Sequence, residues 1–226
     1  MEVSSSSSVE LTACVASSVL SGLALYVPPA LGLEGALVWQ AVLFYVSLLA
    51  LSKLGLQAVT NPAIHAQNVL RNPTWARTQR AAWLSVVDLV GFAAGNLITL
   101  WTVRLIDPNI SFNPIPSKAG FVLSTYAETA LFEGLIVFLL QVWAMYVSES
   151  IYWESAVCTV LIFIFLDITG GYSNPSSYFS RVVLAGEMLD DASAYLLGPI
   201  LGAAAAALVS QVRAQDASIS KKSKSA

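Results

Sequence analysis

Charged residues are scarce in this chain. Asp, Glu, Lys and Arg make up 11% of the 226 residues, whereas hydrophobic residues make up 56%. This composition excludes an ordinary soluble domain. The apolar runs are as long as membrane-spanning helices and lack the strict polar and apolar alternation of an outer-membrane barrel strand. With a net charge of −3 and no basic cluster in the body, no nucleic-acid partner is expected. The sequence therefore predicts an integral, multi-pass helical protein whose surroundings are the lipid bilayer.

Histidine and cysteine are also rare. The only histidine is His65, and the two cysteines, Cys14 and Cys158, lie inside apolar runs, as small buried hydrophobes do. A histidine without a second His or a Cys nearby is a poor metal site, and no serine has a histidine positioned to activate it. We therefore expect no metal, no cofactor, no catalytic residue and no enzyme activity. For His65 two interpretations stay open, a pH-dependent group and a structural residue bonded to neighbouring loop groups.

Six apolar segments are each near the roughly 20 residues that cross about 30 Å of hydrocarbon. They cover residues 9–27, 36–56, 81–106, 120–147, 151–169 and 193–213. Two further segments, 61–71 and 174–186, are too short to span the membrane and suit re-entrant half-helices. The predicted fold is all-α, with six transmembrane helices and two re-entrant half-helices. It forms one channel domain, 9–213, between disordered tails at 1–8 and 214–226.

An Asn-Pro dipeptide opens each short segment, at Asn61-Pro62-Ala63 and at Asn174-Pro175-Ser176. Asn is a leading N-cap residue, and Pro suits the first helical position because its missing N–H would have no partner there. Each dipeptide therefore predicts a helix start at membrane depth. Two facing helix starts would place partial positive charge and two side-chain amides at one lumen. A water oxygen could bind there, whereas cations and protons are disfavoured.

The two halves of the chain follow the same pattern. Each half has a span with an early acidic residue, a second span, an Asn-Pro dipeptide and then a span with two glycines four residues apart. The glycine pairs are Gly91 with Gly95 and Gly198 with Gly202. Small residues at this spacing let helices approach closely. A three-span unit that is repeated once inserts with opposite polarity, so we expect an inverted repeat of residues 9–106 and 120–213.

Six spans place both termini on the same side of the membrane. Basic residues are more frequent on that side, eight against three. The eight are Lys53, Arg71, Arg77, Arg80, Arg213, Lys221, Lys222 and Lys224, and the three are Arg104, Lys118 and Arg181. Cytoplasmic loops carry the excess of Lys and Arg in membrane proteins, so both termini are expected to be cytoplasmic.

Three further stretches carry a family resemblance. Asp167–Pro175 has the pattern Asp-x-Thr-Gly before Asn-Pro, Tyr195–Ala203 has aromatic-x-x-Gly-Pro-x-x-Gly-Ala, and Glu133–Leu140 has Glu-x-x-x-Val-Phe-Leu-Leu. Together with the Asn-Pro dipeptides they resemble the aquaporin, or major intrinsic protein, family over residues 9–213. The resemblance implies a passive channel for water and small uncharged solutes such as glycerol or hydrogen peroxide. It also implies a homotetramer with one pore per subunit.

The second Asn-Pro box departs from the family pattern. The family commonly has Asn-Pro-Ala-Arg, and that Arg lines the outer constriction as a fixed cation, whereas this chain has Asn174-Pro175-Ser176-Ser177. Ser177 therefore stands where the Arg is expected. Arg181 lies one helical turn further on and is a candidate to replace part of the missing charge, because residues i and i+4 share a helix face.

The remaining filter positions follow from the resemblance by position. Ile162 stands at the fifth-span position and Gly171 at the loop position, beside Ser177. The second-span member lies among three residues, of which Phe44 is our candidate: Gln40, Ala41 and Phe44. A filter of this kind carries no charge and has one less bulky wall. We expect it to be wider and less discriminating than that of a strict water channel, as in divergent members of the family.

Acidic residues inside spans are costly, at about 2.5–3.5 kcal/mol each, and need partners. The resemblance implies that Glu10 and Glu133 accept hydrogen bonds from the backbone of the re-entrant loops and that Asp167 supports the second of these loops. Acids that relay protons would instead indicate an ion- or proton-coupled secondary transporter with inverted repeats. A membrane scaffold with a closed pore is a third possibility. The sequence assigns no role to Asp88 or Glu128.

Overall fold

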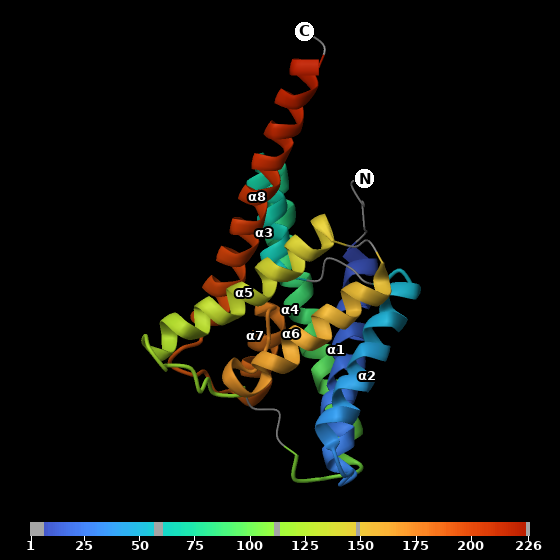
Figure 1. Ribbon diagram of the computed structural model, residues 1–226. Coiled ribbons are helices and arrows are strands. Elements are labelled where there is room, and N and C mark those ends of the chain that lie inside the picture. The colour runs from blue at the N-terminus through green and yellow to red at the C-terminus, as the bar shows by residue number, and fades with distance from the viewer. Residues whose placement is uncertain (1–6, 57–60, 111–113, 148–149, 225–226) are drawn as a thin grey trace.

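The computed structural model describes residues 7–56, 61–110, 114–147 and 150–224, with side chains up to residue 212. Within these residues the chain forms eight helices and no strand (Figure 1). The helices are α1 (Ser7–Ala30), α2 (Ala36–Lys53), α3 (Pro62–Arg71), α4 (Trp75–Arg104), α5 (Thr125–Tyr146), α6 (Ile151–Thr169), α7 (Pro175–Ala185) and α8 (Ala194–Lys224). Six are long and apolar enough to cross a membrane: α1, α2, α4, α5, α6 and α8 up to Val212. The predicted all-α, multi-pass membrane class is confirmed.

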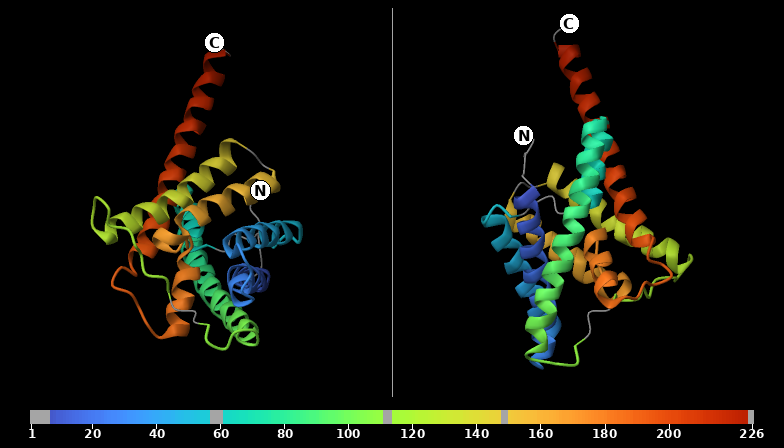
Figure 2. Two further views of the ribbon diagram at one scale, coloured as in Figure 1. Left: turned by 60° about the horizontal axis from the view of Figure 1, so that its bottom comes forward. Right: turned by 180° about the vertical axis from the view of Figure 1, so that it is seen from behind.

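The helices pack in two corresponding sets. α1 packs against α2 and α4, and α5 packs against α6 and α8. The short helices α3 and α7 each contact both α4 and α8, and they also contact each other. α1 begins and α8 ends toward the same side of the bundle (Figure 1). Seen from behind in Figure 2, α4 runs the length of the bundle beside α7. Each short helix thus joins one set to the other.

Glycines let the helices of each set approach closely. A Cβ on Gly95 of α4 would lie 2.5 Å from the Cβ of Ser18 in α1. In the second set, a Cβ on Gly202 of α8 would overlap the carbonyl oxygen of Gly134 in α5. Cβ atoms do not approach heavy atoms so closely in close-packed interiors, so both contacts require glycine. The glycine pairs of the two halves therefore hold equivalent helix pairs together.

Two long helices extend beyond the predicted spans. α4 begins at Trp75 rather than at residue 81, because the side chain of Thr74 caps it by accepting a hydrogen bond from the N–H of Arg77 at 3.3 Å. α8 continues to Lys224, whereas the sequence predicts a disordered tail from residue 214. Residues 203–224 contain no Gly or Pro that would end a helix. Hydropathy marks the apolar part of a helix and misses a polar extension of it.

The segment before α5 wraps around the carboxylate of Glu128. The N–H groups of four consecutive residues, 120–123, donate to its two oxygens at 2.5–2.8 Å. The sequence predicts a span from residue 120, but α5 begins at Thr125, since these N–H groups bond to Glu128 and not to a helix. Glu128 is 4% exposed, and its hydrogen bonds offset the cost of that burial. This residue therefore fixes the entry into α5.

Candidate functional site

Asn61 and Asn174 cap the two short helices in the same way. Both have extended backbone, with φ of −143° and −134°. The side-chain oxygen of each accepts a hydrogen bond from the N–H two residues on, at 2.9 Å in both helices. The donors are Ala63 and Ser176, and the residues between are Pro62 and Pro175. A backbone donor makes this bond, so the replacement of Ala by Ser in the second box leaves the cap intact.

The two helix starts meet. The side-chain amide of Asn61 donates to the carbonyl oxygen of Ser173 at 3.0 Å, although 112 residues separate them in the sequence. Ser173 directly precedes Asn174, so this bond joins the first cap to the second. Each helix start carries roughly half a positive charge from its unpaired N–H groups. The bond therefore brings two positive helix ends to one place.

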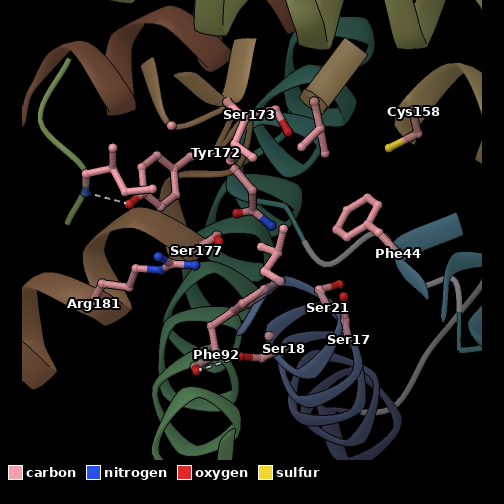
Figure 3. Close-up of a pocket in the computed structure, with 18 of the residues that line it drawn as sticks. Ser17, Ser18, Ser21, Phe44, Phe92, Cys158, Tyr172, Ser173, Ser177 and Arg181 are labelled. Carbon is pink, nitrogen blue, oxygen red and sulfur yellow. Dashed lines mark hydrogen bonds between the residues drawn. The ribbon is translucent and has the colours of Figure 1, made fainter. Parts of the chain in front are cut away.

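One cavity contains both caps (Figure 3). Its volume is about 660 Å³, and among the described residues its wall is formed by every helix except α8. Along α2 the lining runs from Leu37 to Leu48, eleven steps of 1.5 Å, or about 16 Å. All four predicted filter residues line it, together with both asparagines: Phe44, Ile162, Gly171, Ser177, Asn61 and Asn174. The structure thus brings the predicted pore residues to one cavity.

Polar groups line the α1 side of the cavity and apolar groups the α2 side. Ser17, Ser18 and Ser21 of α1 face it, whereas α2 contributes mainly leucines and Phe44 (Figure 3). The hydroxyl of Ser18 donates to Asn96 of α4 at 3.0 Å. Asn96 in turn donates to the hydroxyl of Ser180 in α7 at 2.7 Å, which ties three helices together. The sequence did not single out Asn96, because one amide in a long span gives no signal of its own.

Gly171 packs directly against the backbone of α6. It has a φ of 58°, in the left-handed region, and a Cβ there would lie 2.6 Å from the carbonyl oxygen of Ile162. Both facts favour glycine. The position therefore contributes backbone and no side chain to the wall, which leaves the cavity open on this side. Ser177, in the first turn of α7, adds a single hydroxyl.

Arg181 places a cation on the cavity wall. Its guanidinium carbon lies 5.3 Å from the ring centroid of Tyr26 and 5.2 Å from that of Tyr172. Its Nη1 donates to the hydroxyl of Tyr26 at 2.5 Å, and the residue is 6% exposed. Contacts between a guanidinium and aromatic faces hold the group in place. The charge that Ser177 lacks is thus present one turn further along α7, between two aromatic rings.

Glu133 holds the loop that leads to Asn174. Its carboxylate accepts hydrogen bonds from the N–H of Tyr172 at 3.2 Å, the N–H of Ser173 at 2.5 Å and the hydroxyl of Thr169 at 2.5 Å. Ser173 has a φ of 48°, which is uncommon for any residue other than glycine, and the bond to Glu133 helps to hold it there. Glu133 itself is fully buried. The loop conformation therefore depends on this one carboxylate.

Asp167 does not hold the second loop as the family resemblance implies, and Glu10 lies beside two further ionisable residues. Asp167 is exposed and lines the cavity, and the carboxylate that supports the second loop is that of Glu133. Glu10 lies 3.7 Å from Nε2 of His65, and Asp88 lies 2.9 Å from the same nitrogen. Residues 57–60, the loop that Glu10 is expected to support, lie outside the described residues. The sequence missed the grouping with Asp88 because the three residues are far apart in the chain.

The cavity can bind a small polar molecule. Hydroxyls, side-chain amides, a thiol, a carboxylate, a lysine and a guanidinium face an apolar wall, an arrangement that offers hydrogen bonds to such a molecule. Asn61, Asn174 and Arg181 supply the polar groups on the α3 and α7 side. No protein-family model matches this chain, and no curated protein matches it either. The assignment of function therefore depends on the geometry of the cavity.

Proposed function

We propose that this protein is a passive channel of the aquaporin type, which conducts water and small uncharged solutes along their gradients. The observation that supports it most directly is the pair of Asn-capped helix starts joined across one cavity by the bond from Asn61 to Ser173. A helix start offers fixed positive potential, and the lining amides and hydroxyls offer hydrogen bonds to a passing water. The proposal requires no bond to be made or broken, and so no cofactor.

The proposed selectivity combines two kinds of positive charge. The N-terminal ends of α3 and α7 act in the middle of the pore, and Arg181 acts nearer the end where Tyr26 and Tyr172 lie. A cation that enters would lose its hydration shell and be repelled by the helix ends and by Arg181. Neutral molecules are not repelled. Because Gly171 and Ser177 add little bulk, we place glycerol and hydrogen peroxide among the permeant solutes, beside water.

The proposed topology follows from the same residues. In it α3 and α7 are re-entrant half-helices that enter from opposite sides, residues 9–106 and 120–213 are inverted repeats, and both termini are cytoplasmic. The matched contacts of the two helix sets support this arrangement. A homotetramer is proposed as well, as the family resemblance implies, and the apolar outer surface of the bundle, with Trp101 at 70% exposure, permits it.

A proton-coupled transporter fits the geometry less well. Its coupling acids would have to face the substrate pathway. Among the described acids Asp167 lines the cavity, whereas the buried acids Glu10, Asp88 and Glu133 do not, and Glu133 is engaged with the backbone of the loop before Asn174. One exposed acid on the wall gives no chain of acids along the pathway. A closed-pore scaffold would have no use for a polar cavity wall. Osmotic permeability separates all three possibilities.

The test is stopped-flow swelling of proteoliposomes with two variants of one helix. Ile162 lines the cavity, whereas Ile164 on the same helix is 56% exposed on the outer surface. We expect Ile162→Trp to reduce water permeability to nearly that of empty vesicles, because the indole fills the lumen. Ile164→Trp adds the same bulk outside and should stay within about twofold of the parent. A parent protein no more permeable than empty vesicles would refute the channel, and equal effects of the two variants would refute this pore.

A further inference from the structure

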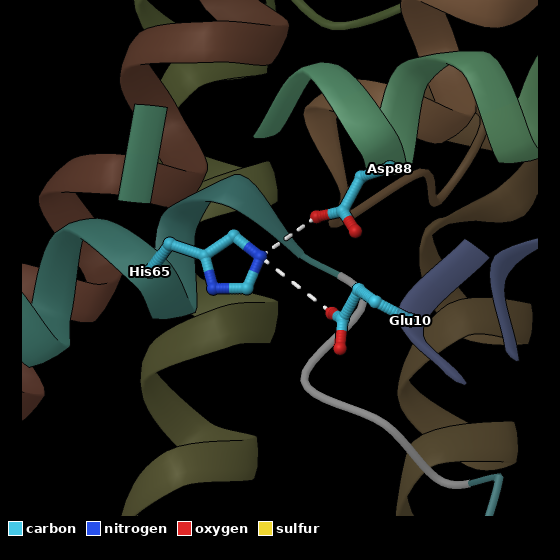
Figure 4. Close-up of side chains that lie close together, drawn as sticks. All are labelled: Glu10, His65 and Asp88. Atoms are coloured by element: carbon cyan, nitrogen blue, oxygen red, sulfur yellow. Dashed lines mark hydrogen bonds and ion pairs between the residues drawn. The ribbon is translucent and has the colours of Figure 1, made fainter. Parts of the chain in front are cut away.

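Three ionisable side chains converge in the first half of the bundle, off the cavity wall. They are Glu10 of α1, His65 of α3 and Asp88 of α4, with exposed fractions of 2%, 4% and 0%. Both carboxylates point at one ring nitrogen, Nε2 of His65 (Figure 4). One donor atom from each residue lies within 4.8 Å of the other two. Three separate helices thus place three metal-binding groups around one buried point.

One proton on the imidazole does not serve both carboxylates. Nε2 carries at most one N–H, and at 2.9 Å from Asp88 that position suits a hydrogen bond. Oε1 of Glu10 stands 3.7 Å from the same nitrogen, which is longer than a hydrogen bond. A metal ion between the three atoms would bind a lone pair from each. The convergence on one nitrogen therefore suits a metal better than a proton.

The charge of the cluster also favours a divalent ion. Two carboxylates and one imidazole share this buried place, and buried ionisable groups are costly unless they are hydrogen-bonded, paired or bound to metal. A divalent cation balances both carboxylates and leaves the imidazole neutral, which is the form that binds metals.

The second half of the bundle shows that the fold does not need the His and the Asp of this cluster. Tyr178 follows Asn174 by four residues, as His65 follows Asn61, and Tyr195 precedes Gly198 by three residues, as Asp88 precedes Gly91. These two tyrosines stack with ring centroids 4.0 Å apart. The same contact between a short and a long helix is thus made by apolar rings in one half and by ionisable groups in the other. A structural role alone leaves the choice of His and Asp unexplained.

We propose that Glu10, His65 and Asp88 bind one divalent transition-metal ion of the Zn²⁺ type. The 2.9 and 3.7 Å separations bracket the edge of about 3.3 Å that a tetrahedron with metal–ligand bonds of 2.0–2.1 Å has. One imidazole nitrogen and two carboxylate oxygens suit Zn²⁺ better than Ca²⁺ or Mg²⁺, which take six or more oxygen ligands. The thiol of Cys14 donates to the other oxygen of Asp88 at 3.2 Å and lies outside the group of three, which leaves the fourth position for a water molecule.

The ion would act on the first helix start. His65 is in the first turn of α3, and its backbone N–H donates to the backbone carbonyl oxygen of Asn61 at 3.2 Å. Metal binding by Glu10 and Asp88 would fix α3 to α1 and α4, and with it the Asn61 amide that reaches Ser173. This inference does not depend on the proposed transport activity, because metal binding is measured on the protein without any transport assay.

The experiment loads the purified full-length protein in detergent with Zn²⁺ after treatment with a chelator. We expect one Zn²⁺ per chain after desalting, and a rise in the thermal midpoint with Zn²⁺ concentration, since a ligand that binds only the folded state stabilises it. Co²⁺ in place of Zn²⁺ should give the intense visible bands of a tetrahedral site. Failure of the parent protein to retain Zn²⁺ would overturn the proposal without any variant.

Isosteric variants then locate the ion. Glu10→Gln, His65→Gln and Asp88→Asn should each weaken Zn²⁺ binding by at least about tenfold, because each removes one ligand of the ion. Glu34→Gln is the matched control, since Glu34 is an exposed acid in the α1–α2 connection and should leave binding unchanged. Equal retention of Zn²⁺ in the three variants and in the control would refute the site. If a variant does not fold, the Co²⁺ spectrum of the parent protein decides.

Discussion

The two halves of this protein have the same order of helices but differ in the residues around their short helices. Glu10 and Glu133 occupy corresponding places in the first span of each half, and their neighbours among the described residues differ: Glu133 bonds to loop backbone, and Glu10 lies 3.7 Å from Nε2 of His65. Seven residues after each cap, α7 has the buried Arg181 on the cavity wall and α3 has the exposed Asn68. The cap geometry is common to both halves. The two halves thus share the geometry of the helix start and differ in the residues that surround it.

The comparison assigns separate tasks to the halves. The second half supplies the charge and the loop that shape the cavity, through Arg181 and Gly171. The first half places its ionisable groups away from the cavity, where they hold the short helix α3 to its neighbours. Ion selectivity should therefore respond to changes near Asn174. The stability of the fold should respond to replacement of Glu10 and of Glu133. The variants below separate these effects.

The largest expected effect comes from removing the carboxylate of Glu133. Glu133→Ala leaves the N–H groups of Tyr172 and Ser173 without their acceptor, and each buried unsatisfied group costs about 1–3 kcal/mol. We expect the folded state to lose about 4 kcal/mol. The measurement is thermal unfolding of the purified protein in detergent. The water permeability of the protein that remains folded is then measured in proteoliposomes.

Glu10→Ala is the matched variant in the first half, measured without added metal. The variant leaves His65 with its partner Asp88 at 2.9 Å, so the contact between α3 and α4 is kept. Its destabilisation should be about half that of Glu133→Ala or less. An equal or larger loss in Glu10→Ala would show that the two acids have the same task after all.

The next effect in size concerns Arg181. Arg181→Gln removes a charge that, at about 8 Å and an effective dielectric of about 20, repels a monovalent cation by roughly 2 kcal/mol. We therefore expect K⁺ leak through proteoliposomes to rise by about ten- to thirtyfold, with water permeability nearly unchanged. Asn68→Asp on the corresponding face of α3 changes charge by the same amount away from the cavity and should leave the leak at the parental level. A leak that is unaltered in Arg181→Gln would assign cation exclusion to the helix ends alone.

Much of the fold could be predicted because its signals are local. A span of about 20 apolar residues is visible in composition, and Asn-Pro sets a helix start through its own side chain and ring. The segment 151–169 was predicted with the bounds that α6 has in the structure. Boundaries failed where a distant partner decided them, as Glu128 does for residues 120–123.

The candidate site divides in the same way. Phe44, Ile162, Gly171 and Ser177 were predicted by position from the family resemblance, and all four line one cavity. The grouping of Glu10, His65 and Asp88 could not be predicted from the sequence, because it forms only when three helices that are separate in sequence pack together. Likewise the sequence shows Arg181 but not the two tyrosines that hold its guanidinium. The tertiary contacts of a single polar residue produce no periodic pattern in the sequence, so they cannot be predicted from it.

The smallest expected effect isolates one glycine of the second half. Gly171→Ala combines a left-handed φ of 58° with a Cβ 2.6 Å from the carbonyl oxygen of Ile162. Gly35→Ala, before α2 in the first half, has a similar φ of 65° but no heavy atom within 4 Å of the new Cβ. Backbone strain of about 1–2 kcal/mol is common to both, so their difference in thermal midpoint measures the close contact with α6 alone. We expect Gly171→Ala to be the less stable by about 1 kcal/mol, the lower end of the cost of overpacking, and to reduce glycerol flux more than water flux. Equal midpoints and equal fluxes would mean that the loop can move away from Ile162, and that Gly171 does not set the width of the cavity.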